Sequence, residues 1–380
     1  MLLQAYQRLH QAGIEPDWAG GSLDGDLRGF IDARRSHCGI ARQRELSSVV
    51  LPPSGSNTRH PLDVAHPALV GAGATRQVAI LLAATPSMLR VYQPFINLWR
   101  CYALRHGLQF ILETDDTEVR PPHRRAKNWI RWFAVRRHLD FYEALLVVDP
   151  DTFVVPECWN VSIPAVLGST AAARRGQHAS PDVGMRDFGR PQTLNNGVVL
   201  VRSTPRGRFF LDQLLAKAAW MQTIEKDQGA FDETVLEVLG LEALSRGEDG
   251  YDSECVQHVF PNARGNHEVA LYALCWWRVS ERLAGPFGAR LSDTIRFADP
   301  RLADVNHVVG ARGMSEPAVL HHFAGRSKDW DAMLDAFGVP PRQTMDCHAV
   351  HEHVHAAGAA RLCVPGAAEV AECEDGLLVC

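Results

Sequence analysis

The fold is decided by the stretch Ala144-Leu-Leu-Val-Val-Asp149-Pro150-Asp151-Thr152-Phe153-Val-Val155. Five apolar residues end abruptly at two carboxylates that lie one residue apart, and apolar residues then resume. A short run that is rich in Val and Leu and followed by Pro is typical of a buried strand. We therefore expect Asp149 and Asp151 to leave the sheet together where this strand ends.

Two carboxylates at this spacing favour a metal ion. They repel each other unless a cation lies between them, so the pair suits Mg²⁺ or Mn²⁺ that holds a phosphorylated substrate. A plain Asp-Pro-Asp turn that closes the strand is the alternative, because Asp and Pro are ordinary turn residues. This stretch alone leaves both interpretations open.

Composition excludes several classes of protein. The chain has 380 residues, 46% hydrophobic and 22% charged, which is ordinary globular usage and allows one large α/β domain with extensions or two domains. A net charge of −5 gives no global positive field that would indicate nucleic-acid binding. No segment reaches the roughly 18 uninterrupted apolar residues that a membrane span needs.

The composition changes along the chain predict three parts. Residues 1–75 read as an N-terminal extension and linker that ends in a Pro/Gly/Ser-rich cluster. Residues 76–335 form the main domain. Residues 336–380 read as a tail, His-rich at first and then poorly patterned and disordered. The His-rich part around Cys347 is either a zinc-binding tract or a solvated tail.

Cysteine usage and the N-terminus bear on the compartment. The nine cysteines contain no CxxC pair and are widely spaced, which favours free thiols over a disulfide framework. The first ten residues lack the apolar core of a signal peptide. A cytoplasmic protein is therefore the default expectation.

A strand–helix–strand pattern precedes the acidic stretch. Residues 77–85 and 108–114 are strand-like, and residues 87–106 between them have helical periodicity. This order predicts an α/β fold with a parallel sheet, in which ligands bind beyond the carboxyl ends of the strands. Thr85 and Asp149 both fall at that edge. The absence of GxGxxG and GxxxxGK[ST] after the first strand disfavours a dinucleotide fold or a P-loop ATPase.

A basic helix is predicted over residues 123–142. Lys127 and Arg131 could reach a diphosphate at the sheet edge, but a solvated basic face is the favoured interpretation for most of its charges. Residues 165–191 are Gly/Arg/Ser-rich and are predicted to form a surface loop. The turn at Asn196 and Gly197 then precedes another buried strand, and its Gly indicates a close backbone approach.

Four motifs in order produce a recognisable pattern. These are the Asp-x-Asp pair, LNNGVVLVR at 194–202, DQGAF at 227–231 and HHFAGRSKDW at 321–330. The pattern resembles retaining glycosyltransferases of the GT-A fold. It is most similar to the yeast α-galactosyl/α-mannosyltransferase and plant xyloglucan xylosyltransferase family, with the glycogenin-like family as a near relative. The resemblance covers residues 76–335 and implies a Rossmann-like, mostly parallel central sheet with helices on both faces.

The resemblance also implies a metal site. Asp149 and Asp151 match the pair that binds Mn²⁺ or Mg²⁺ and, through the metal, the diphosphate of a UDP- or GDP-sugar. His322 matches the third ligand, with His321 as the alternative one register step away. The remaining matches are Gly325 and Lys328 at the diphosphate, Asn196 and Gly197 under the donor sugar, Asp227 and Gln228 near the reacting anomeric carbon, Lys127 as the basic residue before the Asp pair, and Thr85 at the nucleotide.

The implied activity is transfer of a hexosyl or pentosyl unit to a glycan or other hydroxyl acceptor, with retention. Two alternatives stay open. A haloacid-dehalogenase-like phosphatase would use Asp149 as nucleophile and Asp151 as acid/base, and a non-catalytic relative would only bind a sugar nucleotide. Eukaryotic relatives work in the Golgi, which would change the expected compartment to its lumen or membrane.

Overall fold

The computed structural model describes residues 77–115, 117–119, 127–154, 158–168, 181–186, 194–217, 220–221, 226–247, 294–298, 303–305, 320–322 and 347. The side chains of 186, 296–298, 303–305 and 321 are outside this description. The predicted extension over 1–75, Gly325 and Lys328, and most of the predicted tail therefore lie outside the described residues.

The predicted strand–helix–strand unit is present. Strand β1 (Val78–Ala83) is followed by helix α3 (Pro86–Arg105) and strand β2 (Gln109–Glu113). The helix begins with Pro, whose fixed φ suits the first helical position. The two strands pair in parallel, as a crossover through a helix requires. This part of the sequence prediction is confirmed.

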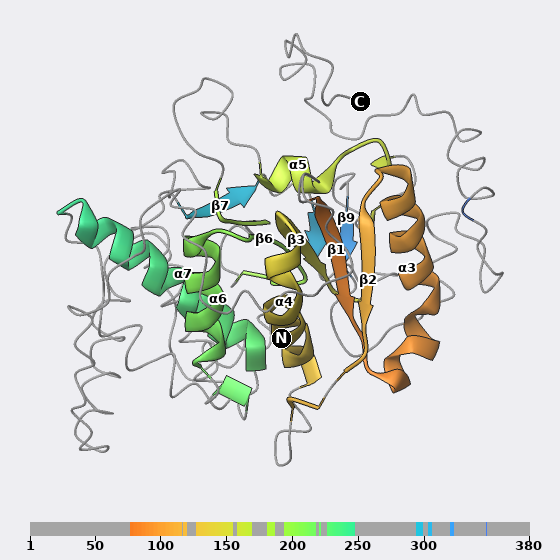
Figure 1. The fold of residues 1–380 in the computed structure, drawn as a ribbon, viewed down its shortest axis with the longest axis horizontal. Coiled ribbons are helices and arrows are strands. Elements are labelled where there is room, and N and C mark those ends of the chain that lie inside the picture. The colour runs from red at the N-terminus through yellow and green to blue at the C-terminus, as the bar shows by residue number, and fades with distance from the viewer. Residues whose placement is uncertain are drawn as a thin grey trace, which may run out of the picture.

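The central sheet has six strands in the order β2-β1-β3-β6-β5-β7 (Figure 1). The four strands beyond β2 and β1 are β3 (Ala144–Val148), β6 (Val198–Arg202), β5 (Val183–Arg186) and β7 (Ile295–Ala298). Three of the five pairings are parallel, and β6 runs antiparallel to both of its neighbours. The predicted α/β class with a mostly parallel sheet is confirmed.

The antiparallel direction of β6 positions the site. Val148 at the end of β3 pairs with Val198 at the start of β6. The turn before β6 therefore lies beside the Asp pair that follows β3. Polar segments 46 residues apart in the sequence meet at one edge of the sheet.

Helices cover both faces of the central sheet. The side chains of Leu145 and Val147 on β3 pack into one core cluster, and those of Leu146 and Val148 pack into the other. The first cluster contains residues of α4 (Ile130–His138), α6 (Pro205–Leu215) and α7 (Lys226–Ser245), and the second contains residues of α3 and α5 (Ile163–Gly168) (Figure 1). A strand buried on both sides must be apolar at every position, which explains the continuous run that precedes Asp149.

Short 3₁₀ turns flank α4. The turns are η3 (Lys127–Trp129) and η4 (Leu139–Phe141).

A second, smaller sheet adjoins the first. The small sheet has the order β4-β9-β8, from β4 (Thr152–Val154), β9 (Leu320–His322) and β8 (Ala303–Val305). Thr152 pairs with His322 across the antiparallel β4–β9 ladder. This pairing places His322 next to the residue that follows the Asp pair.

The prediction of a surface loop over 165–191 is wrong in part. Helix α5 occupies its start, and β5 is a strand between β6 and β7 in the central sheet. A Cβ added to Gly184 on β5 would lie 2.4 Å from the backbone oxygen of Leu167 on α5. Because α5 crosses so close to β5, the strand needs a glycine, which weakens the apolar pattern expected of a buried strand.

The expectation of free thiols is wrong for two cysteines. Cys101 on α3 and Cys347 form a disulfide across 246 residues of sequence, with a Cα–Cα distance of 5.1 Å. Cys158 is buried and free. The pair lacks a short spacing, so only the folded arrangement brings the two sulfur atoms together. The bond attaches a residue of the predicted tail to the main domain.

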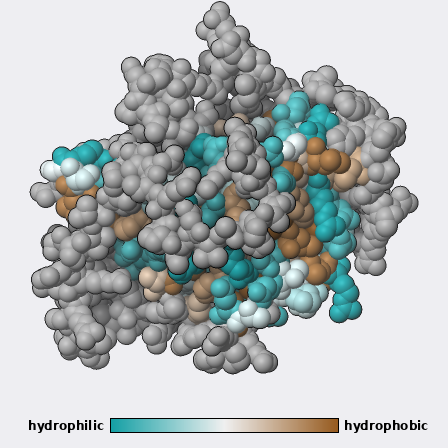
Figure 2. All heavy atoms as spheres, viewed as in Figure 1, coloured by the Kyte–Doolittle hydropathy of each residue, from teal (hydrophilic) through white to brown (hydrophobic). Residues whose placement is uncertain are grey.

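The visible face of the described residues mixes hydrophilic and hydrophobic side chains (Figure 2). Within the described part of the chain, the large exposed hydrophobic residues are Val91, Leu104, Phe141 and Leu244. No helix among the described residues has the length and apolar character to cross a membrane.

Candidate metal centre

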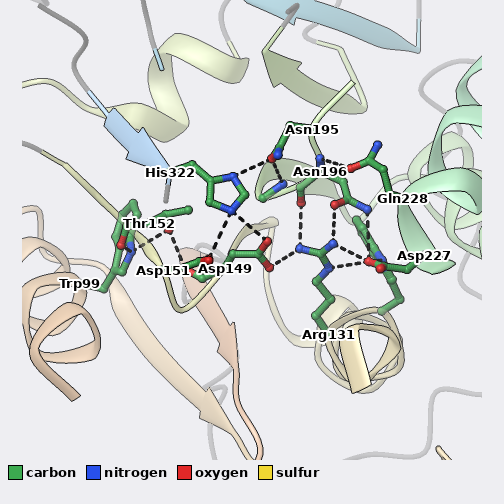
Figure 3. Close-up of polar contacts among 12 residues, drawn as sticks. Trp99, Arg131, Asp149, Asp151, Thr152, Asn195, Asn196, Asp227, Gln228 and His322 are labelled. Carbon is green, nitrogen blue, oxygen red and sulfur yellow. Dashed lines mark hydrogen bonds and ion pairs between the residues drawn. The ribbon is translucent and has the colours of Figure 1, made fainter. Parts of the chain in front are cut away.

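Three potential ligands converge where β3 ends. One ligand atom from each of Asp149, Asp151 and His322 lies within 4.8 Å of the others. The Nε2 atom of His322 is 3.3 Å from Asp151 Oδ1 and 3.6 Å from Asp149 Oδ2 (Figure 3). The sequence predicted this set of residues, and the structure brings all three together as a possible metal site.

The chemistry of this set fits a divalent cation. Carboxylate oxygens suit Mg²⁺ and Mn²⁺, and an imidazole nitrogen is a ligand that transition metals accept more readily than Mg²⁺ does. Neighbouring ligand atoms around an octahedral ion of this size lie about 3 Å apart. The separations of 3.3 and 3.6 Å are slightly longer than that spacing, so a small movement of the side chains would bring the three ligand atoms to the distances of one coordination shell.

Arg131 on α4 binds the other side of Asp149. Its Nη1 donates to Asp149 Oδ1 and, at 3.1 Å, to the backbone oxygen of Asn196. Its Nε donates to Asp227 Oδ2 at 3.0 Å, and its Nη2 donates to Asp227 Oδ2 and Asn196 Oδ1. Burial lowers the pKa of Arg131, but Asp149 and Asp227 more than offset this, so the pKa is raised and the group stays charged.

The sequence had favoured a solvated position for most charges of this helix, and Arg131 departs from that. Its side chain is only 5% exposed, whereas Lys127, which the resemblance selected as the basic residue, lies exposed in η3. Arg131 lies between Ile130 and Trp132, which are both buried. The sequence offered no signal for this burial, because adjacent residues of a helix point in different directions and a charged residue is rarely buried unless it is paired.

Asp227 and Gln228 are occupied by contacts within the protein. Asp227 is 1% exposed, and its Oδ2 accepts four N–H groups, from Arg131 Nε and Nη2, Trp132 Nε1 at 3.1 Å and Asn196 Nδ2 at 3.2 Å. Gln228 accepts from the backbone N–H of Asn196 at 3.0 Å and donates to Asp232 Oδ1 at 2.8 Å. Both residues hold the turn before β6.

The predicted close-approach turn is present at Gly197. Its backbone oxygen accepts the N–H of Asp149 at 2.7 Å. A Cβ at this position would lie 2.5 Å from Cε1 of His322, so no side chain fits here without moving the imidazole. The turn also contains a residue that the sequence reasoning had not selected, Asn195, whose Oδ1 is 2.9 Å from Nδ1 of His322.

The carboxylates impose a strong local field. Burial raises the pKa of Asp149, against the opposing effect of Arg131 and His322, and Asp151 and Asp227 raise it further. Burial together with Asp151 and Asp149 raises the pKa of Tyr92, on the second turn of α3, to about 12. The phenol of Tyr92 therefore stays protonated near the site. A bound cation would counteract the repulsion between Asp149 and Asp151.

Thr85 lies at the carboxyl edge of the sheet, as expected. It is 2% exposed, it immediately precedes α3, and its hydroxyl is 3.0 Å from that of Ser87. Further along the same helix, Trp99 donates from Nε1 to the backbone oxygen of Thr152 at 2.8 Å (Figure 3). This contact fixes α3 against the segment that follows Asp151.

The chain is similar to solved structures rather than to known family models or curated sequences. One similar solved structure is a glycosyltransferase involved in the glycosylation of the major capsid of PBCV-1, with a TM-score of 0.38 and 14% identity over 74% of this chain and 99% of that chain. No protein-family model matches the chain, and no curated protein matches it. Similarity at this level does not establish a family, so the function has to be inferred from the site itself.

Proposed function

We propose that this protein is a metal-dependent glycosyltransferase that moves a hexosyl or pentosyl unit from a UDP- or GDP-sugar to a hydroxyl acceptor, with retention. The observation that carries the proposal is the Asp149–Asp151–His322 cluster at the carboxyl edge of the sheet. The four sequence motifs, whose order resembles retaining glycosyltransferases of the GT-A fold, supply the reaction class.

The charges of the cluster support a divalent ion. Asp149, Asp151 and Asp227 carry three negative charges, and Arg131 carries one positive charge that Asp149 and Asp227 share. Asp149 and Asp151 also lie together around Nε2 of His322, and each carboxylate disfavours the ionised form of the other. A divalent cation between two neighbouring carboxylates offsets their mutual repulsion.

In this proposal Asp149, Asp151 and His322 hold the metal, which supplies Lewis-acid stabilisation of the diphosphate leaving group. Arg131 fixes Asp149 Oδ1, so that Oδ2 is directed toward His322. We place the nucleotide near Thr85, with Lys127 at the start of the basic helix and Gly325 and Lys328 at the diphosphate. Asn196 and Gly197 form the turn under the donor sugar.

We assign Asp227 and Gln228 to positioning rather than to covalent chemistry. An enzyme nucleophile needs an accessible lone pair, and Asp227 is buried beneath Arg131, Trp132 and Asn196. Retention then follows from front-face substitution. The bond from the anomeric carbon to the phosphate oxygen breaks, the acceptor oxygen forms a bond to the same face, and the proton of the acceptor hydroxyl goes to the departing phosphate.

A donor screen tests the proposal. Purified protein with Mn²⁺ is incubated with UDP- and GDP-sugars, and release of the nucleoside diphosphate is followed. We expect metal-dependent turnover with at least one donor, and its loss in Asp151→Ala. The matched control is Asp212→Ala, an exposed Asp on α6 outside the cluster, which should retain turnover. Equal turnover in wild type and Asp151→Ala would contradict the metal assignment.

The same assay separates the phosphatase alternative. A phosphatase with Asp149 as nucleophile would release inorganic phosphate from simple phosphate esters and would leave the sugar nucleotide intact. A glycosyltransferase would do the opposite, and anomer-resolved analysis of its product reports retention or inversion directly.

A further inference from the structure

Asn195 connects the turn before β6 to the imidazole of the metal cluster. Its Oδ1 lies 2.7 Å from the backbone nitrogen of Gly197 and 2.9 Å from Nδ1 of His322 (Figure 3). The second contact joins residues that are 127 positions apart in the sequence. The same amide oxygen therefore contacts two nitrogen atoms. Because the backbone nitrogen of Gly197 is a known donor, it shows which protonation the Nδ1 atom of His322 must have.

The backbone contact identifies the amide atom. The N–H of Gly197 can only donate, so the atom that faces it at 2.7 Å must be an acceptor, the amide oxygen. The opposite orientation of the amide would place an NH₂ group against a backbone donor. Because that oxygen cannot donate, the hydrogen between it and His322 must be on Nδ1.

A proton on Nδ1 prepares the other ring nitrogen for a metal. In neutral imidazole only one nitrogen is protonated, so Nε2 then has a free lone pair. Nε2 is the atom directed at Asp151 and Asp149, at 3.3 and 3.6 Å. In imidazolium Nδ1 also donates to Asn195. Of the two neutral tautomers, the contact therefore excludes the one with its proton on Nε2, which has no lone pair to offer a metal at the nitrogen that faces Asp151 and Asp149.

We propose that Asn195 is a positioning residue that fixes His322 in the metal-binding tautomer and orientation, and this inference rests on the proposed metal role of His322. Partners of this kind keep the imidazole ligand in place, and their loss typically weakens metal affinity by about 10–100-fold. Gly197 contributes to the same arrangement twice. Its N–H fixes the Asn195 oxygen, and its lack of a Cβ leaves room for the ring.

The first test reads the tautomer without metal or substrate. In protein labelled with ¹⁵N-histidine, at alkaline pH, two-bond ¹H–¹⁵N correlations distinguish a protonated ring nitrogen from an unprotonated one. The His322 signals are assigned by their loss in His322→Gln. We expect the protonated-type shift at Nδ1 in wild type and a shift toward the Nε2-protonated form in Asn195→Leu. A wild-type ring protonated mainly at Nε2 would overturn the inference.

The second test measures Mn²⁺ affinity by electron paramagnetic resonance of the free ion. The Leu side chain in Asn195→Leu has a shape similar to that of Asn but no hydrogen-bond acceptor. This variant should bind Mn²⁺ about 10–100-fold more weakly than wild type. Asn195→Asp keeps an acceptor for both contacts and should bind within about threefold of wild type, or more tightly. If Asn195→Leu does not fold, Asn195→Asp and the tautomer of wild-type His322 still test the inference. A tenfold loss of Mn²⁺ affinity in Asn195→Asp would contradict it.

The two proposals fail in different ways. If wild type binds no Mn²⁺ at all, the proposed function fails, and the tautomer measurement still reports on Asn195. If wild type binds Mn²⁺ and His322→Gln weakens it, but Asn195→Leu binds as wild type does, the metal site stands and the role of Asn195 is refuted.

Discussion

The two oxygens of Asp149 belong to regions of opposite character. Oδ1 faces a closed network in which Arg131, Asp227 and Asn196 bind one another. Oδ2 faces Asp151 and His322, where one ligand atom from each of the three side chains lies within 4.8 Å of the others. We call the first region the closed side and the second the open side.

The difference shows how one strand end serves both folding and function. A buried charge network is stable only when each member has its partners, as on the closed side. The open side brings two carboxylates together, and their mutual repulsion creates affinity for a cation. Asp149 links the two, because Arg131 fixes its position for the open side.

The largest expected loss of stability comes from a substitution of Arg131 on the closed side. Arg131→Met removes the cation between buried Asp227 and partly buried Asp149, and removing one partner of a buried pair costs about 3–5 kcal/mol. Urea unfolding should show a fall of that size in the free energy of unfolding. The matched control, Arg136→Met on the exposed face of the same helix, should change it by less than about 0.5 kcal/mol.

A double variant distinguishes lost pairing from lost packing. If Asp227 is costly in Arg131→Met because it is left unpaired, Arg131→Met/Asp227→Asn should recover part of the stability that the single variant loses. A double variant whose loss equals the sum of the two single losses would show that the two residues do not interact as described.

The next largest effect is expected from Asp151→Asn, which changes the open side and leaves the contacts of the closed side in place. Asp151→Asn removes one of two neighbouring negative charges, so the metal-free free energy of unfolding should change far less than in Arg131→Met. Mn²⁺ at 100 times its dissociation constant should stabilise wild type by about 2.7 kcal/mol. We expect this increment in Asp212→Asn and its absence in Asp151→Asn, measured by thermal unfolding with and without Mn²⁺. An increment that persists in Asp151→Asn would place the ion elsewhere.

The open side was predictable from sequence to a greater extent than the closed side. Asp149 and Asp151 follow an apolar run that is typical of a strand buried on both faces, and a His after a later strand completes a recognisable ligand set. The closed side depends on the tertiary placement of α4 and α7. Neither helix shows in its pattern that Arg131 or Asp227 is buried, because buried charges occur at positions that periodicity assigns to apolar residues.

The same limit explains the errors in the fold. β5 was missed because Gly184 lies under α5 and interrupts the apolar pattern. α7 was not predicted as a helix, and its residues from Gly229 to Ala243 are all buried, which removes the amphipathic stripe that identifies a surface helix. The Cys101–Cys347 bond joins two residues that are 246 positions apart in the sequence and meet only in the folded chain. In each case the decisive contact comes from a distant part of the chain.

A smaller effect is expected where the two sides meet. Gly197→Ala places a Cβ 2.5 Å from the ring of His322, so the ring or the turn must shift and the observed position of the ring relative to Asp149 and Asp151 is lost. We expect Mn²⁺ affinity to fall about tenfold, or about 1.4 kcal/mol, while the urea midpoint of metal-free protein shifts only modestly. Val198→Ala, on the next residue, is the control. If Gly197→Ala keeps wild-type affinity, the imidazole does not need its observed position to bind the ion.

The smallest effect tests whether Gln228 belongs to the closed side. Gln228→Ala removes two hydrogen bonds, to the backbone of Asn196 and to Asp232, which should cost about 1–2 kcal/mol of stability. Mn²⁺ affinity should stay within about twofold, because the contacts of Asp149, Asp151 and His322 do not pass through this side chain. The opposite pattern, unchanged stability with a large loss of turnover, would mean that Gln228 contacts the substrate. The boundary between the two sides would then run through α7 rather than through Asp149.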